Sequence, residues 1–193
     1  LLAGLAGSLT AKEPVTEGET DAVMLDLDPY MIKALRGNKL KGRWGTKGSI
    51  VQLIKVPAFQ KLVKKHDLKL FNGPMLGSIS PTSVKVWIRS AGPASFQIAV
   101  GKLKSKMVTT SAESDYTGVA LIEGLKPYTE YKYSVILDGK EINKDYFHFK
   151  TAPKQGQPSK LSITFGSGAR YQPASEGIWR TMTDQKPMAH LAL

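Results

Sequence analysis

The segment GLKPYTEYKYSV, residues 124–135, decides the fold of this protein. Its second half begins an alternation of large and polar side chains in which Tyr131, Tyr133, Val135 and Leu137 occupy every second position. Successive side chains of a β-strand point to opposite faces, so a period of two places these four residues on one face. The segment therefore predicts a long β-strand with one buried face.

Further stretches of the sequence alternate in the same way, and turn-forming residues such as Asp138-Gly139 separate them. The alternating stretches are SVKVWIRS (83–90), SFQIAVG (95–101), GVALIEG (118–124) and DYFHFKTAP (145–153). Several short alternating strands at this spacing are typical of an antiparallel sandwich. Within the last stretch His148 alternates with Phe147 and Phe149, so we expect its side chain to face solvent.

The spacing of Leu125, Pro127, Thr129 and Tyr131 resembles that of fibronectin type III domains, in which Leu-x-Pro-x-Thr-x-Tyr leads into a long strand. In such domains the tyrosine hydroxyl bonds back to upstream backbone and forms the tyrosine corner. The FKTAP ending (149–153) also resembles the last strand of these domains. The resemblance implies a fibronectin type III-like sandwich over residues 73–153. It says little about activity, because such folds carry many functions.

Residues 12–72 are predicted to form a basic, helical region before the sandwich, with helices within 28–37 and 56–70 that each begin near a proline. The stretch from Lys33 to Lys69 holds eleven Lys and Arg and one acidic residue, so it supplies nearly all of the formal net charge of +11. Such a stretch favours an anionic polymer or a membrane surface as partner. The simpler alternative is a solvated face paired with the preceding acidic residues. Aromatic residues are too sparse there for base stacking, so specific nucleic acid recognition is not expected.

The first eleven residues, LLAGLAGSLTA (1–11), resemble the end of a signal peptide with its small-residue cleavage site. The alternative is an ordinary Ala- and Gly-rich terminus. If the segment is a signal remnant, the protein is secreted, periplasmic or on the cell surface. The sequence has no cysteine, which excludes disulfides and thiolate metal ligands but is compatible with an exported bacterial protein.

A polar linker, KQGQPSK (154–160), separates the sandwich from a different pattern in residues 161–193. There an apolar strand, LSITFG (161–166), precedes a Gly-rich turn, an amphipathic helix within 176–187 and a second apolar strand (188–193). The helix carries an apolar stripe of Ile178, Trp179 and Met182. We expect both strands to be buried, which makes His190 a core histidine.

The Gly-rich turn is the candidate active-site loop, because ligands of open α/β sheets bind beyond the carboxyl ends of the strands. Its residues are Ser167, Gly168, Arg170 and Tyr171. Small residues let backbone approach a ligand, and Arg170 and Tyr171 could reach a phosphate. The alternative is a tight strand-to-helix connection flanked by ordinary surface residues.

The order of these elements resembles that of the PhoD-like alkaline phosphatases, which are exported metallophosphatases and phosphodiesterases. The resemblance rests on a sandwich that opens with GPMLGSISPTSVKVWIR (73–89), closes with FKTAP, and is followed by FGSGARY (165–171), a Trp-bearing helix and an apolar strand. It implies that the chain is the N-terminal fragment of a secreted, metal-dependent phosphoesterase acting on phosphomonoesters or phosphodiesters. Residues 161–193 would then begin its α/β metallophosphatase domain.

The resemblance also implies where the metal chemistry resides. In the family the last strand runs into a Gly-Asp-x-x-Tyr motif whose Asp binds the metals, and this motif is expected after Leu193. The fragment alone is therefore expected to bind no metal and to be inactive, whereas the parent would use calcium, iron or manganese.

Gly168 departs from the family pattern, which commonly has an iron-ligating Cys at that position. This departure favours a branch with oxygen and nitrogen ligands and harder cations, the alternative being an inactive parent. A function of another class also remains open, namely an extracellular binding module that recognises polyanions through residues 33–69.

Overall fold

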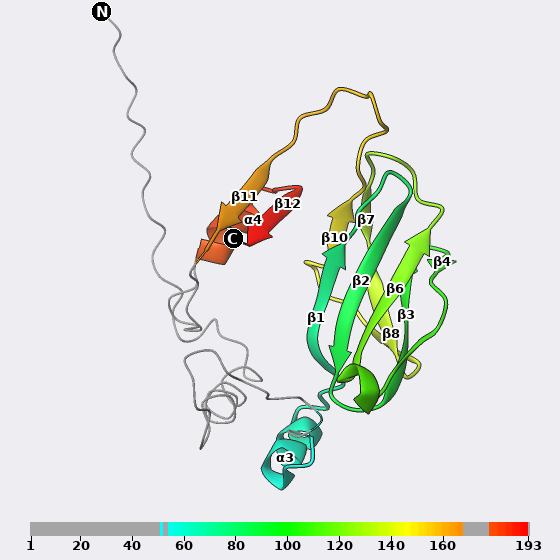
Figure 1. The fold of residues 1–193 in the computed structure, drawn as a ribbon, viewed down its shortest axis with the longest axis vertical. Coiled ribbons are helices and arrows are strands. Elements are labelled where there is room, and N and C mark those ends of the chain that lie inside the picture. The colour runs from blue at the N-terminus through cyan, green and yellow to red at the C-terminus, as the bar shows by residue number, and fades with distance from the viewer. Residues whose placement is uncertain (1–50, 52–53, 168–177, 193) are drawn as a thin grey trace, which may run out of the picture. The chain divides into compact units, whose positions relative to one another are not determined.

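The computed structural model describes residues 51, 54–167 and 178–192. The chain divides into two compact units, of which one spans residues 25–160 and the other includes residues 161–193 (Figure 1). The predicted signal remnant, the helix expected within 28–37 and most of the basic stretch lie outside the described residues. The described helices are too short and too polar to cross a membrane.

Helix α3 (Pro57–Lys65) confirms the second predicted helix. Its fixed proline φ suits the first turn, where the missing N–H would have no helical partner. Phe59 is fully buried and meets Phe71 edge to face, with 5.5 Å between ring centroids. The helix ends at Lys65, five residues before the end of the predicted range, because Asp67 takes a left-handed φ of 44° and the Leu68 N–H bonds back to the Val63 carbonyl.

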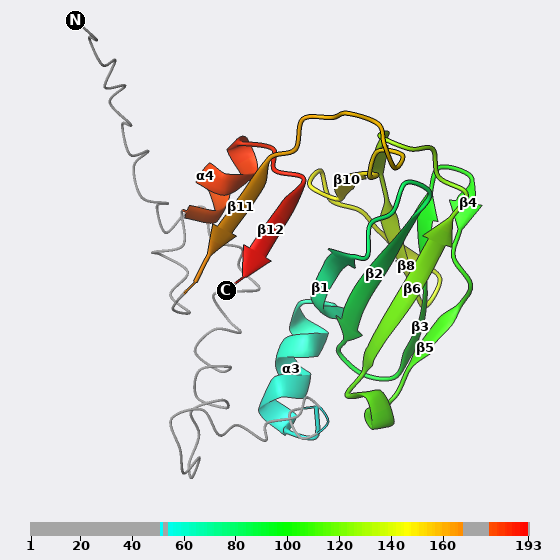
Figure 2. The ribbon, with the colours of Figure 1, turned by 45° about the horizontal axis from the view of Figure 1, so that its top comes forward.

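Antiparallel sheets form the larger unit, and Figures 1 and 2 show the β1-β2-β6 layer lying over the β3-β8 layer. The first layer consists of β1 (Leu70–Gly77), β2 (Ser83–Ser90) and β6 (Thr117–Glu123). The second has the order β4-β3-β8-β9, with β5 also paired to β3. Its strands are β3 (Ala94–Val100), β4 (Leu103–Lys104), β5 (Val108–Thr110), β8 (Ser134–Leu137) and β9 (Lys140–Ile142). The predicted antiparallel sandwich is confirmed.

Shorter elements complete this unit. Strands β7 (Glu130–Lys132) and β10 (His148–Lys150) pair with each other, and the 3-10 helix η2 (Ala112–Ser114) precedes β6. The single long strand predicted after residue 130 is therefore wrong, because β7 pairs with β10 whereas β8 pairs with β3, and Tyr133 lies between the two. The Asp138-Gly139 turn joins β8 to β9 with φ values of 48° and 77°, which is the left-handed pair that a two-residue hairpin requires.

The core lies between the layers and takes every second residue of the strands that the sequence predicted. Both layers contribute to one cluster of buried side chains: Val84, Val86, Ile88, Ala120 and Ile122 from the first, and Phe96, Ile98, Val100, Tyr133, Val135 and Leu137 from the second. Phe147 and Phe149 join this cluster, and His148 between them is exposed as predicted. Full burial of each large apolar side chain contributes about 1.5–3 kcal/mol.

The predicted tyrosine corner is present at the crossing from β6 to β7. The backbone N–H of Lys126 donates a hydrogen bond of 2.7 Å to the Tyr131 hydroxyl oxygen. Thr151, whose role the sequence analysis missed, secures the same corner from the end of β10. Its buried hydroxyl donates to the Lys126 carbonyl at 2.7 Å and accepts from the Thr129 N–H at 2.9 Å.

We predict that Thr151→Val lowers the free energy of unfolding by about 1–3 kcal/mol, because the isosteric change leaves the Thr129 N–H and the Lys126 carbonyl without this partner. Urea denaturation followed by tryptophan fluorescence measures the effect. Thr109→Val, at an exposed position of β5, is the control and should be nearly neutral. Equal midpoints for the two variants would contradict this role of the hydroxyl.

Gly118 in β6 is fixed by the core side chain that faces it. A Cβ at this position would lie 2.7 Å from Cε1 of Phe96, which is fully buried. We predict that Gly118→Ala destabilises the sandwich by about 1–3 kcal/mol through overpacking. Gly77→Ala is the control, since no neighbouring atom lies within 4 Å of its added Cβ. The midpoint of thermal unfolding should be lower for Gly118→Ala than for Gly77→Ala. Equal midpoints would show that Phe96 and its neighbours move aside without a cost in stability.

Candidate functional site

The candidate loop follows the first strand of a small strand–helix–strand unit. Strands β11 (Ile163–Gly166) and β12 (Ala189–Ala192) run parallel, and helix α4 (Ile178–Asp184) lies between them in the chain. Their pairing brings Gly166 opposite Ala192, so the carboxyl ends of both strands meet at one edge. That these strands begin a metallophosphatase domain stays a prediction.

The structure describes one of the four residues assigned to the loop. Ser167 directly follows β11 and is exposed. Gly168, Arg170 and Tyr171 lie outside the described residues. The structure therefore places Ser167 at the carboxyl edge of the two strands and leaves the other three assignments as predictions.

The prediction that both strands are buried is wrong for the described structure. Ile163 is 51% exposed, Phe165 71% and Leu191 51%. The register places Phe165 opposite Leu191 and Ile163 opposite Ala189, so these side chains share one face of the strand pair. Strands of parallel sheets are ordinarily covered on both faces. The apolar sequence here reflects a face that the described residues leave open.

His190 is exposed and not the core histidine that the sequence analysis predicted. Its Nδ1 lies 3.0 Å from the hydroxyl of Thr164, directly opposite on β11, and its ring meets Trp179 of α4 edge to face at 5.1 Å. An added Cβ on Gly166 would lie 3.8 Å from the His190 ring. The period of two places Thr164 and Gly166 on one face of β11. That His190 shares this face follows only from the pairing of β11 with β12, which the sequence does not show.

Helix α4 is shorter than predicted and its apolar stripe is only partly covered. It ends at Asp184, three residues before Pro187, and the N–H groups of Gln185 and Lys186 bond back to the last turn. Ile178 and Trp179 are exposed, while Met182 is half-buried. Trp179 is therefore not a core residue, and its ring contacts that of His190.

The described residues do not present a metal centre. No group of three or more His, Cys, Asp or Glu side chains among residues 51, 54–167 and 178–192 is placed to hold an ion. The residues described here therefore do not fit the metals that the family resemblance implies.

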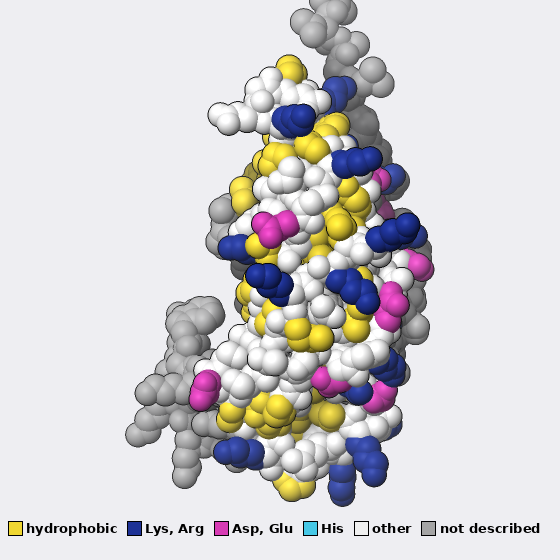
Figure 3. Space-filling model, turned by 90° about the vertical axis from the view of Figure 1, so that its right-hand side faces the viewer, with side chains coloured by type: hydrophobic (Ala, Val, Ile, Leu, Met, Phe, Trp, Pro, Cys, Tyr) yellow, Lys and Arg dark blue, Asp and Glu magenta, His cyan; other side chains and the backbone are white. Residues whose placement is uncertain are grey.

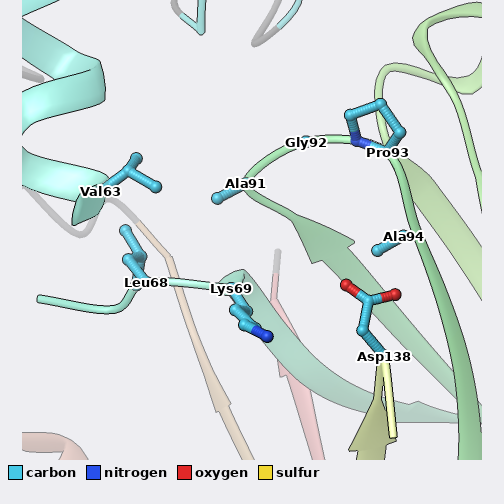
Figure 4. Close-up of a pocket in the computed structure, with 8 residues that line it drawn as sticks. All are labelled: Val63, Leu68, Lys69, Ala91, Gly92, Pro93, Ala94 and Asp138. Atoms are coloured by element: carbon cyan, nitrogen blue, oxygen red, sulfur yellow. The ribbon is translucent and has the colours of Figure 1, made fainter. Parts of the chain in front are cut away.

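Hollows between α3 and the turn at residues 91–94 offer no alternative catalytic site (Figure 4). The smaller, of about 120 Å³, has Lys69 and Asp138 as its charged lining residues. Asp138 is committed to the fold, because its carboxylate accepts a hydrogen bond of 2.9 Å from the Ser95 N–H. The larger, of about 280 Å³, is lined mainly by apolar side chains such as Phe59 and Val63.

Comparison with known proteins supports the fold. The model of a family described as "Domain of unknown function (DUF7800)" matches residues 67–153. A search of curated protein sequences found no match. Among solved structures, the "Structure of PhoD" is similar with a TM-score of 0.51 and 17% identity, over 61% of this chain and 26% of the PhoD chain. The chain thus spans about a quarter of the PhoD chain that it matches.

Weaker similarities involve smaller β proteins. A redesigned β-sandwich protein has 14% identity and a TM-score of 0.31, over 45% of this chain and 96% of its own. The sensor domain of the anti-sigma factor RsgI4 of Pseudobacteroides cellulosolvens has 18% identity and a TM-score of 0.31, over 45% and 95%. Scores this low bear on neither fold nor function.

Shifted pKa values in the sandwich have structural causes. A hydrogen bond from Lys140, with Nζ 2.6 Å from Oδ2, and the charge of that lysine hold the pKa of the exposed Asp67 carboxyl below its ordinary value. Burial, helped by the charge of nearby Tyr146, raises the pKa of Tyr133 to about 12. Tyr133 stacks on Phe147 in the core, with ring centroids 5.2 Å apart. Neither group marks a functional site.

We predict an alkaline loss of stability that depends on Tyr133. An unfolded tyrosine ionises near pH 10, whereas the folded side chain keeps its proton to about pH 12. Stability from this difference is complete below about pH 10 and falls by about 1.4 kcal/mol per pH unit up to about pH 12. Chemical denaturation between pH 9 and 12 should show this slope in the wild type and in the control Tyr128→Phe, whose half-buried side chain is not among the causes of the Tyr133 shift. Its persistence in Tyr133→Phe would contradict the assignment.

Proposed function

We propose that this chain is the N-terminal part of a secreted, metal-dependent phosphoesterase related to PhoD. The observation that carries the proposal is the order of the elements: a fibronectin-like sandwich followed in the chain by a parallel strand–helix–strand unit. The similarity to PhoD supports this proposal. The similarity covers 61% of the chain, which is a larger share than residues 67–153, the part that the family model matches. The parent protein would hydrolyse phosphomonoesters or phosphodiesters.

In this proposal the loop after β11 lines one side of the substrate site. Ser167 lies at the carboxyl edge of the strands, where ligands of open parallel sheets bind. Arg170 would hold a phosphoryl oxygen by a charge-assisted hydrogen bond, and Tyr171 would contribute a hydroxyl donor. Gly168 would leave room for backbone approach and give no ligand to a metal.

The metal ions would be held by residues that follow Leu193. Bound calcium, iron or manganese would polarise the phosphoryl group in the parent. The described residues fit no such ion, so their proposed share of the chemistry is positioning of the phosphate group. The sandwich would be a separate module that precedes the catalytic domain in the chain.

We predict that purified residues 1–193 hydrolyse neither nitrophenyl phosphate nor bis-nitrophenyl phosphate, whichever of calcium, manganese or iron is supplied. The product of the full reading frame should hydrolyse at least one of them. In that longer protein Arg170→Ala should lower kcat/KM at least about tenfold, since a hydrogen bond to a charged group contributes about 1.5–3 kcal/mol. Arg89→Ala, in the sandwich, is the control and should leave kcat/KM unchanged.

Two results would reject the proposal. One is a reading frame that ends at Leu193 in the intact gene. The other is metal-dependent turnover by residues 1–193, which would place the active site elsewhere. A longer protein that binds metal yet turns over neither substrate would direct attention to Gly168, and restoration of activity by Gly168→Cys would identify that residue as the cause.

A polyanion-binding module remains the second candidate, and one observation favours it. Lys61 and Lys64 are exposed on α3, in the part of the basic stretch that the structure describes. A soluble polyphosphate that binds residues 1–193, and loses affinity on Lys61→Gln with Lys64→Gln, would support this role whether or not the parent is an enzyme.

A further inference from the structure

We propose that the edge of the sandwich formed by residues 101–107 docks on an anionic lipid bilayer. This segment, named here the edge segment, runs from the end of β3 through β4 to the start of β5. The proposal is independent of phosphoester hydrolysis and of the basic stretch before the sandwich.

The edge segment combines positive charge with exposed apolar side chains. Lys102, Lys104 and Lys106 are all exposed, and residues 99–112 contain no acidic residue. Between and beside these lysines, Leu103 is 39% exposed and Met107 58%. Lysines attract an anionic membrane surface, and exposed Leu and Met can enter the boundary between headgroups and acyl chains.

The backbone of the edge segment is held in place, so its side chains are displayed permanently. Ser105 is 5% exposed and takes the inward position. Its hydroxyl accepts a hydrogen bond of 3.0 Å from the Ile98 N–H, and its own N–H donates to the Ile98 carbonyl at 2.9 Å. Pairing with β3 on both sides of Ser105 fixes the remainder. Leu103 and Met107 are therefore exposed because the paired backbone holds them outside the core.

Strand β6 extends the same surface. Val119 is 50% exposed and Leu121 42%, and Lys85 lies opposite Leu121 in the register. Leu103 reaches toward the end of this strand, 4.0 Å from where a Cβ on Gly124 would lie. Figure 3 views this side of the sandwich and shows Lys and Arg side chains standing between hydrophobic patches.

Acidic groups near the surface do not cancel its charge. Glu113 in η2 and Glu123 at the end of β6 are exposed. Asp115, between η2 and β6, is paired with Arg89 at 3.0 Å. Against Glu113 and Glu123 stand the three lysines of the edge segment and Lys85 of β2. The local balance is positive, which is the sign that complements phosphatidylglycerol and similar headgroups.

Two simpler explanations account for the lysines of the edge segment but not for its exposed apolar side chains. Lysines on an edge strand discourage pairing with another chain, but exposed Leu103 and Met107 would work against that purpose. A soluble polyanion would use the lysines and gain nothing from these apolar side chains. A bilayer surface uses both.

The first test compares two triple variants of residues 1–193 in co-sedimentation with vesicles of phosphatidylglycerol and phosphatidylcholine. Lys102→Gln, Lys104→Gln and Lys106→Gln together should weaken binding at least about tenfold, because each lysine near an anionic surface contributes roughly a fivefold factor. The matched control changes three exposed lysines elsewhere: Lys132→Gln, Lys144→Gln and Lys154→Gln. It removes the same charge and keeps residues 33–69, so it should stay within about twofold of the wild type.

The second test asks whether apolar side chains enter the bilayer. The natural chain has no cysteine, so Leu103→Cys can be labelled at one place with an environment-sensitive fluorophore. Its emission should shift to the blue on anionic vesicles and not on phosphatidylcholine alone. Tyr146→Cys, exposed in the segment between β9 and β10, is the control and should not shift.

Three outcomes would overturn the proposal. One is equal vesicle binding by the two triple variants. Another is an unshifted emission at position 103 on vesicles that bind the protein. The third is unchanged vesicle binding by Leu103→Ser with Met107→Ser, together with binding of soluble polyphosphate that the edge lysines control, which would identify the surface as a site for free polyanions.

Discussion

The hydroxyl of Thr151 is the polar contact on which the closing of the sandwich depends. The chain leaves the first layer at the end of β6 and enters β7 through residues 124–129, most of which are exposed or half-buried. At this crossing Thr151 accepts from the Thr129 N–H and donates to the Lys126 carbonyl. Two backbone hydrogen bonds join the same segments: the Thr151 N–H donates to the Thr129 carbonyl, and the Tyr128 N–H donates to the Ala152 carbonyl. A buried hydroxyl is tolerated here because both its donor and its acceptor capacity are used.

Aromatic side chains reinforce this corner from outside and inside. The Lys150 ammonium lies 3.5 Å from the ring centroid of Tyr128, while in the core Tyr133 stacks on Phe147 and meets Phe149 at a tilt of 56°. The corner therefore joins a cation–π contact at the surface to the apolar cluster within.

The two units differ in how much apolar surface they bury. In the sandwich, side chains such as Ile88 and Ile98 are wholly enclosed between layers. In the strand–helix–strand unit, Phe165 and Leu191 share one face of the strand pair, and the described residues leave both side chains exposed. A parallel strand pair with a bare apolar face is consistent with our proposal that a larger α/β domain continues from it.

The sequence by itself indicated the sandwich, because a period of two recurs in several short stretches that turn residues separate. It did not indicate that the stretch with Tyr131, Tyr133 and Val135 divides into β7 and β8. Local spacing also identified the tyrosine corner and the exposed His148. It did not indicate β1, in which Gly73-Pro74 interrupts the alternation, nor the two- and three-residue strands β4, β5 and β9, which are too short to show a period.

Tertiary structure decided which residues meet across the chain. The partners of Thr151 lie 22 and 25 residues away. The alternation that begins with Phe147 and Phe149 places Thr151 on the inward face, but it does not say which backbone groups the hydroxyl meets. The same holds for His190, whose apolar neighbours suggested burial although its partners are Thr164 and Trp179 on an exposed face. Strand pairing also settled that Ser105 points inward and leaves Leu103 in solvent. Such outcomes depend on long-range register, which the spacing of residues along the chain does not contain.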